Sequence, residues 1–159
     1  MGPMITEQEA IRIETWVGEA VRQGANLLCG GKRVGSLYEP TVLENVTSEM
    51  KVDSNEVYAP VVSLYRISSL EQAIEKANEV PYGLHAAIFA RDVDVAFQAA
   101  YQLDAGGIVV NDSTDYRLDS MPFGGVKYSG LGREGVKYAL MEMTEPKVVC
   151  FNLKRPPLG

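Results

Sequence analysis

Two cysteines and one histidine are the first candidates for nucleophilic or metal chemistry in this sequence. Cys29 and Cys150 lie far apart and neither belongs to a CxxC pair, so their spacing predicts neither a disulfide framework nor a zinc site. We interpret both as ordinary thiols, which favours a cytoplasmic location. His85 lies in an apolar stretch, where a structural or surface role is favoured, and a single histidine cannot build a His-rich metal cluster. No metal site is therefore expected.

The run from Gly130 to Gly135 matches G-x-G-x-x-G, a pattern that can mark a dinucleotide-binding turn. That use needs a strand directly before the first glycine and an acidic residue about 20 positions later. Here a turn-like segment, 122–125, precedes the run, and Arg155-Pro-Pro stands at the later position. We therefore reject the Rossmann interpretation. Residues 122–135 are expected to form a glycine-rich loop that leads into a helix, and such loops often border a ligand site.

Periodic segments around these residues indicate the elements that must position them. Thr6 and Glu9 form a capping box, and Asp92 is expected to cap a later helix. Apolar residues recur at helical spacing in four segments, 7–24, 70–80, 93–103 and 135–143. Residues rich in β-formers predict four strands, at 61–67, 86–90, 108–111 and 147–153. The central order of strand, helix, strand, helix, strand implies an α/β fold, with a mostly parallel sheet and helices on both faces.

Composition limits the classes of function. The 159 residues suffice for one domain, and the apolar share of 46% fits a protein with a real core. The net charge of −6 and the lack of a basic stripe disfavour a nucleic-acid partner. The apolar runs are short and broken by charge, so no membrane span is expected, and Met1-Gly2-Pro3 does not resemble a signal peptide.

Several spaced motifs together resemble the aldehyde dehydrogenase superfamily. Residues 122–135, PFGGVKYSGLGREG, are similar to its pattern PFGGxKxSGxGREG, and residues 55–61, NEVYAPV, are similar to its element EE-[IV]-F-G-P-V. Other matching elements fall at the family's spacings, at 77–78, 82–84, 105–111 and 144–147. The resemblance runs from about Ile5 to Leu153 and points to the C-terminal part of the catalytic domain of an NAD(P)-dependent enzyme.

This resemblance implies an enzyme that oxidises an aldehyde to a carboxylic acid with NAD or NADP. In the family a cysteine thiolate attacks the aldehyde, hydride passes to the cofactor, and water activated by a glutamate hydrolyses the thioester. The nucleophile and the base lie upstream of the segments that match here. The isolated chain is therefore expected to be inactive, with the N-terminal remainder of the parent enzyme as its partner. Residues 1–146 would be part of the catalytic domain, and residues 147–159 an oligomerisation strand and tail of a homo-oligomer.

The resemblance also assigns one wall of the cofactor site. Glu56 aligns with the glutamate that accepts hydrogen bonds from the nicotinamide ribose, and Tyr58 aligns with an aromatic residue near the nicotinamide. Leu84 and Phe123 align with apolar residues at the mouth for cofactor and substrate. From the residues alone, a solvated charge is the favoured interpretation of Glu56, and the two apolar side chains could equally be core. Asn55 and Ala59 depart from the family's glutamate and glycine, as Tyr58 departs from its phenylalanine.

Two charged residues complete the expected site. Glu134 aligns with a glutamate associated with proton passage, although a glutamate at a helix start is also favourable by itself. Residues 111–121 resemble a loop of dehydrogenases for lactaldehyde-like or phosphono-aldehydes, in which an arginine lies near the substrate. Arg117 could therefore bind a small anionic or polar aldehyde together with Phe123, or it could simply pair with Asp115 or Asp119.

A non-enzymatic function is the alternative. The chain could be a truncated paralogue or an interaction domain, because the nucleophile of the family's reaction is not among its motifs. The upstream reading frame of the parent gene would separate the two classes.

Overall fold

A long helix packed on a small sheet forms the first part of the chain. The protein is described from a computed structural model that places residues 2–153. Helix α1 (Glu7–Arg22) begins as the capping box predicts, because the Thr6 side chain accepts a hydrogen bond from the Glu9 N–H. The helix buries Ile13 and Val17 in a cluster with Leu43 and Met50, which is the main core of this part.

The sheet beneath α1 has the strand order β1-β4-β5. Strand β1 (Asn26–Cys29) is antiparallel to β4 (Thr41–Glu44), and β5 (Val61–Leu64) is parallel to β4. A short hairpin of β2 (Arg33–Val34) and β3 (Leu37–Tyr38) and a helical turn α2 (Lys51–Ser54) complete this part. The pattern of the sequence did not indicate β1 as a strand, since its four residues are all exposed and show no alternation.

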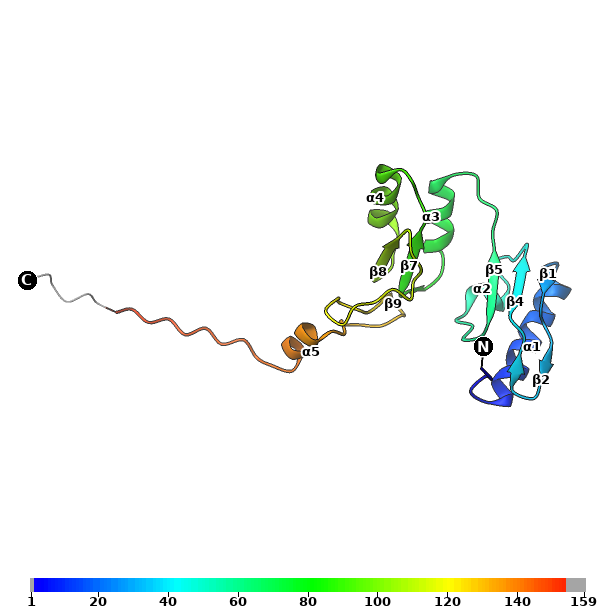
Figure 1. The fold of residues 1–159 in the computed structure, drawn as a ribbon, viewed down its shortest axis with the longest axis horizontal. Coiled ribbons are helices and arrows are strands. Elements are labelled where there is room, and N and C mark those ends of the chain that lie inside the picture. The colour runs from blue at the N-terminus through cyan, green and yellow to red at the C-terminus, as the bar shows by residue number, and fades with distance from the viewer. Residues whose placement is uncertain (1, 154–159) are drawn as a thin grey trace, which may run out of the picture.

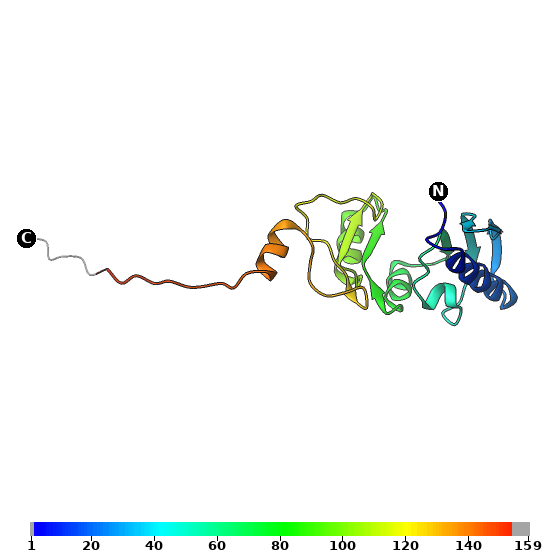
Figure 2. The same cartoon turned by 90° about the horizontal axis from the view of Figure 1, so that it is seen from below.

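The second part contains the predicted strand–helix–strand unit. Helix α3 (Leu70–Asn78) leads through β6 (Tyr82–Gly83) into β7 (His85–Ile88), and α4 (Val93–Gln102) crosses to the parallel strand β8 (Gly107–Val110). Ser69 and Asp92 cap the two helices with their side chains, as expected for Asp92. The later strand β9 (Val126–Lys127) returns to pair with β6, and α5 (Val136–Glu142) follows the glycine-rich loop (Figures 1 and 2).

The expectation of one mostly parallel sheet with helices on both faces is wrong for the described residues. These form four separate sheets of two or three strands, of which β4–β5 and β7–β8 are parallel. The α/β class and the order of the central elements are confirmed. No described strand hydrogen-bonds to both the β4–β5 pair and the β7–β8 pair, so the two parallel pairs remain in separate sheets.

The predicted strand at 147–153 is also not formed. Residues 145–153 are extended without strand pairing, and Val148 is 93% exposed. The segment leads away from the rest of the structure, so no described edge is available to receive its backbone hydrogen bonds (Figure 1). An apolar segment forms a strand only when a neighbouring strand accepts and donates its backbone hydrogen bonds. Residues 154–159 of the predicted tail lie outside the described part.

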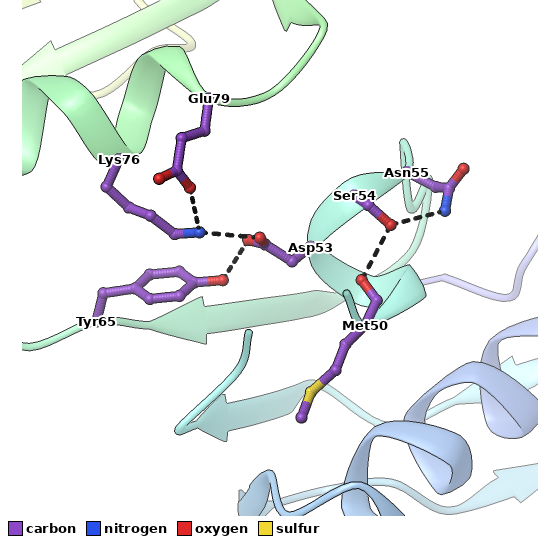
Figure 3. A network of polar contacts seen from close by, with 7 residues as sticks. All are labelled: Met50, Asp53, Ser54, Asn55, Tyr65, Lys76 and Glu79. Atoms are coloured by element: carbon purple, nitrogen blue, oxygen red, sulfur yellow. Dashed lines mark hydrogen bonds and ion pairs between the residues drawn. The ribbon is translucent and has the colours of Figure 1, made fainter. Parts of the chain in front are cut away.

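A polar network joins the two parts of the chain. Lys76 of α3 binds Asp53 of α2 and Glu79, and Tyr65 donates its hydroxyl to the same Asp53 carboxylate (Figure 3). Burial is the largest cause of the raised pKa of Tyr65, which is about 12, and the hydrogen bond to Asp53 is the second cause.

In the described range 2–153, no helix is long and apolar enough to cross a membrane.

Candidate functional site

Glu56 and Leu84 line one hollow at the junction of the two parts. Its volume is about 290 Å³, and its wall includes Asn78, Tyr82 and Ser129. Two of the four residues assigned to the cofactor, although distant in sequence, therefore share a surface. The Glu56 carboxylate is exposed there and is available to accept hydrogen bonds from a ligand.

The polar wall of this hollow is held by hydrogen bonds between side chains and the backbone. Asn78 donates to the Gln102 carbonyl at 2.7 Å and accepts from the Asp104 N–H at 2.8 Å, which fixes the turn after α4 against α3. The Ser129 hydroxyl accepts a hydrogen bond of 2.9 Å from the Gly83 N–H. The glycine-rich loop is thereby attached to β6, next to Leu84.

Tyr58 lies outside this arrangement. Its side chain is 77% exposed and lines another hollow, beside Pro3 and Arg12 at the start of the chain. Its backbone has a φ of 49°, in the left-handed region that a bulky residue seldom adopts. The structure therefore does not bring Tyr58 to the hollow that contains Glu56 and Leu84.

A second cluster joins Arg117, Phe123 and Glu134. The Arg117 guanidinium lies 4.1 Å from the centre of the Phe123 ring, and its Nη2 atom lies 2.9 Å from Glu134 Oε2. Phe123 and Glu134 also pair through their backbones in an isolated antiparallel bridge. Arg117 therefore pairs with Glu134, and among the described residues it forms no ion pair with Asp115 or Asp119.

His85 links the hollow to this cluster, a role that the sequence analysis did not predict. Its ring meets Phe123 edge to face at 4.9 Å between centres, and its Nδ1 atom lies 3.1 Å from the Thr114 carbonyl oxygen. It lines the Glu56 hollow as well as a small cavity beside Arg117. Its position directly after Leu84 is the only signal that could have indicated this role.

Two glycines allow close approaches at the start of β8, one to the glycine-rich loop and one to the His85 ring. A Cβ on Gly106 would overlap the carbonyl oxygen of Gly124, so a side chain at position 106 would push the loop away. A Cβ on Gly107 would lie 2.6 Å from His85 Nε2. These close contacts set the distance between β8, the His85 ring and the loop that carries Phe123.

The two cysteines lie away from both groups of residues. Cys29 ends β1 and Cys150 lies in the extended tail, and both are free and exposed. Among residues 2–153, no three His, Cys, Asp or Glu side chains are grouped so that they could hold a metal ion. The described site therefore offers groups that bind and orient, with no cysteine nucleophile on its walls.

Comparison with known proteins identifies the family of this chain. The model of the aldehyde dehydrogenase family matches residues 1–149, which is nearly the whole chain. The chain belongs to the aldehyde dehydrogenase family. Members of this family use NAD or NADP, in agreement with the cofactor that the motifs imply.

Curated aldehyde dehydrogenases of several substrates are similar to this chain. An aspartate-semialdehyde dehydrogenase of Pseudomonas canavaninivorans is 53% identical over 96% of the chain, and a 3-sulfolactaldehyde dehydrogenase of Priestia megaterium is 48% identical over the same share. The second is a lactaldehyde-type enzyme, which confirms the resemblance to that branch. The chain spans only about a third of these relatives, 33% and 32% of their lengths.

The fold agrees with a solved aldehyde dehydrogenase. The structure of the glyceraldehyde-3-phosphate dehydrogenase GapN from Methanocaldococcus jannaschii, complexed with NADP, is 47% identical to this chain with a TM-score of 0.84. The match covers 89% of this chain and 31% of that protein. The described residues therefore have the fold of a fragment of an aldehyde dehydrogenase.

Proposed function

We propose that this chain is the C-terminal part of the catalytic domain of an enzyme that oxidises a small anionic aldehyde to a carboxylic acid with NAD or NADP. The observation that carries the proposal is the shared hollow of Glu56 and Leu84 in a chain of this family. In this reaction the cofactor supplies the acceptor for the hydride. The residues of this chain bind and orient, whereas the cysteine that forms the thioester and the general-base glutamate belong to the remainder of the parent enzyme.

Glu56 has the chemistry needed to hold the cofactor. An exposed carboxylate at the edge of a hollow can accept hydrogen bonds from both hydroxyls of a ribose diol, which fixes the ring that follows. Leu84 supplies an apolar surface beside it, and Phe123 lies beyond His85 on the substrate side. Tyr58 remains a cofactor residue only if it turns toward this hollow in the complete enzyme.

Arg117 is the group in this chain that would recognise the charge of the substrate. A guanidinium binds carboxylate, sulfonate or phosphate oxygens through paired N–H donors. The relatives named above act on aspartate semialdehyde, 3-sulfolactaldehyde and glyceraldehyde 3-phosphate, which carry those three groups. We therefore propose an anionic aldehyde as the substrate. Phe123, under the guanidinium, would contact its carbon chain.

We extend the proposal to the whole protein. The N-terminal remainder would supply the nucleophile, so the 159-residue chain alone is expected to be inactive. A homo-oligomer in the cytoplasm, assembled partly through residues 147–153, fits the exposed thiols and the unpaired apolar tail. Neither a nucleic acid nor a membrane is proposed as a partner.

An assay of the full-length protein and of the chain alone tests the proposal. We expect the full-length protein to reduce NAD or NADP with an anionic aldehyde such as succinate semialdehyde, and the chain alone to show neither dehydrogenase nor esterase activity. Cys29→Ala and Cys150→Ala should leave the full-length activity intact. A full-length protein without aldehyde oxidation would support the non-enzymatic alternative. Turnover by the isolated chain that survives both substitutions would contradict the assignment of the nucleophile.

A further inference from the structure

Two contacts restrain the Arg117 side chain from two sides. The guanidinium lies on the Phe123 ring at 4.1 Å, and its Nη2 atom forms an ion pair of 2.9 Å with Glu134. Arginine is otherwise a flexible side chain that loses rotamer freedom when it binds a ligand. A guanidinium that is already restrained loses less freedom, so these contacts would prepare it for binding.

Glu134 and Phe123 are themselves connected. The Phe123 N–H donates to the Glu134 carbonyl at 3.1 Å, and the Glu134 N–H donates to the Phe123 carbonyl at 2.6 Å. This bridge joins the two ends of the turn from 123 to 134, so that both partners of Arg117 come from one paired backbone unit. A shift of this unit would therefore move both contacts of the guanidinium together.

The remaining donors of Arg117 are accessible. A guanidinium has five N–H donors, and the ion pair uses those of Nη2. The side chain is 41% exposed and lines the small cavity shared with His85 and Met121. The remaining N–H donors of the Arg117 guanidinium can thus bind an anionic group while Glu134 and Phe123 restrain the side chain.

We infer that Glu134 is a positioning residue that orients Arg117 toward the anionic group of the aldehyde. This inference rests on the proposed function, and it gives Glu134 a different role from proton passage. A positioning role acts on recognition of the substrate charge and needs only a hydrogen-bond acceptor at position 134. Proton passage acts on turnover of every aldehyde and needs a group that can be protonated.

Substitutions in the full-length protein separate the two roles. We would measure kcat and KM for succinate semialdehyde and for the neutral propionaldehyde in Glu134→Ala, Glu134→Gln and Arg117→Ala. Misplacement by about 1 Å can cost as much as a hundredfold, so we expect Glu134→Ala to lower kcat/KM for the anionic aldehyde on the order of tenfold, mainly through KM. Propionaldehyde should change little, and Glu134→Gln should retain most of the preference because its amide oxygen still accepts from Arg117.

Asp115→Asn and Asp119→Asn are the matched controls, because both are acidic residues of the same loop that form no ion pair with Arg117 in the described structure. They should leave the preference for the anionic aldehyde unchanged. An equal loss of kcat for both aldehydes in Glu134→Ala and Glu134→Gln would overturn the inference in favour of proton passage. A preference that moves in Arg117→Ala but not in Glu134→Ala would overturn it while leaving the anionic substrate in place. If the wild-type protein oxidises no aldehyde, the proposed function itself fails.

Discussion

Lys76 Nζ lies 3.0 Å from Asp53 Oδ2, and this ion pair joins α3 to α2 across the junction of the two parts of the chain (Figure 3). The Asp53 side chain is only 10% exposed and that of Lys76 24% exposed, so both groups have lost much of their hydration. Glu79 extends the network on the exposed side of the same lysine. The junction beside the Glu56 hollow is therefore held by polar side chains.

Removal of Lys76 should destabilise this junction. In Lys76→Met the Asp53 carboxylate keeps only the Tyr65 hydroxyl of its two partners, and we expect a loss of about 1–3 kcal/mol in the free energy of unfolding. Glu79→Gln is the control, because its more exposed pair with Lys76 should contribute less than about 1 kcal/mol. Urea unfolding of the chain followed by circular dichroism measures both. Equal losses in the two variants would contradict the importance of Asp53.

Alkaline pH should weaken the same network. Burial and the bond to Asp53 raise the pKa of Tyr65 from 10.0 to about 12. Burial, the largest effect on Lys76, lowers its pKa, but the bonds to Glu79 and Asp53 outweigh it and raise the pKa overall. Each group thus binds its proton more tightly in the folded state than in the unfolded state. Their stabilisation is complete below pH 10 and is lost as the pH rises toward 12.

Tyr65→Phe tests this pH dependence directly. The variant should be less stable than wild type at pH 8, because it lacks the hydrogen bond to Asp53. Its stability should then fall less steeply between pH 10 and pH 12, since the raised pKa of Tyr65 has been removed. Parallel stability curves for the two proteins over this range would show that Tyr65 does not titrate as described.

Two glycine-to-alanine substitutions should have opposite signs. At Gly106 a Cβ would overlap the Gly124 carbonyl oxygen, so Gly106→Ala should destabilise the chain by about 1–3 kcal/mol. At Gly18, within α1, a Cβ would meet only Arg22 at 3.5 Å, so Gly18→Ala should stabilise it by roughly 0.5–1 kcal/mol. Thermal unfolding measures both changes. A harmless Gly106→Ala would mean that the loop can move away from β8.

Glu56→Gln in the full-length protein should slow hydride transfer more than it weakens aldehyde binding. The neutral amide is a poorer acceptor for the ribose hydroxyls, so the cofactor ring would be held less accurately. Pre-steady-state measurement of NAD(P)H formation should show a slower first turnover, with the KM for the aldehyde little changed. Glu79→Gln, on the exposed side of the junction, serves as the control. An unchanged hydride step would remove Glu56 from the cofactor site.

Residues 147–153 should behave as an unpaired edge. Their backbone has no strand partner, and Val148, Phe151 and Leu153 are exposed, which favours pairing with another chain. We expect rapid hydrogen exchange of these residues in the monomeric chain and protection when the chain self-associates. Light scattering of the chain and of a version that ends at Glu145 should show association only for the longer one. A monomer with a protected tail would show that the segment pairs within its own chain.

The sequence by itself determined the main helices and the family. Local signals were sufficient for α1, α3 and α4, because the caps at Thr6 and Asp92 and the spacing of apolar residues act within a few residues. The motifs at 55–61 and 122–135 were sufficient to indicate an aldehyde dehydrogenase, which the match over residues 1–149 confirms. Strand pairing was not determined in this way, since it depends on neighbours that are distant in sequence.

Only the tertiary structure decided which side chains meet. The sequence left Arg117 with Asp115 and Asp119 as its nearest acidic partners, yet the bridge between Phe123 and Glu134 brings a carboxylate from 17 positions away to the guanidinium. The same folding places His85 against Phe123 and turns Tyr58 away from the hollow of Glu56. These contacts depend on loop closure and on the close backbone approach that glycine allows. The periodicity of residues along the chain encodes neither of these two features.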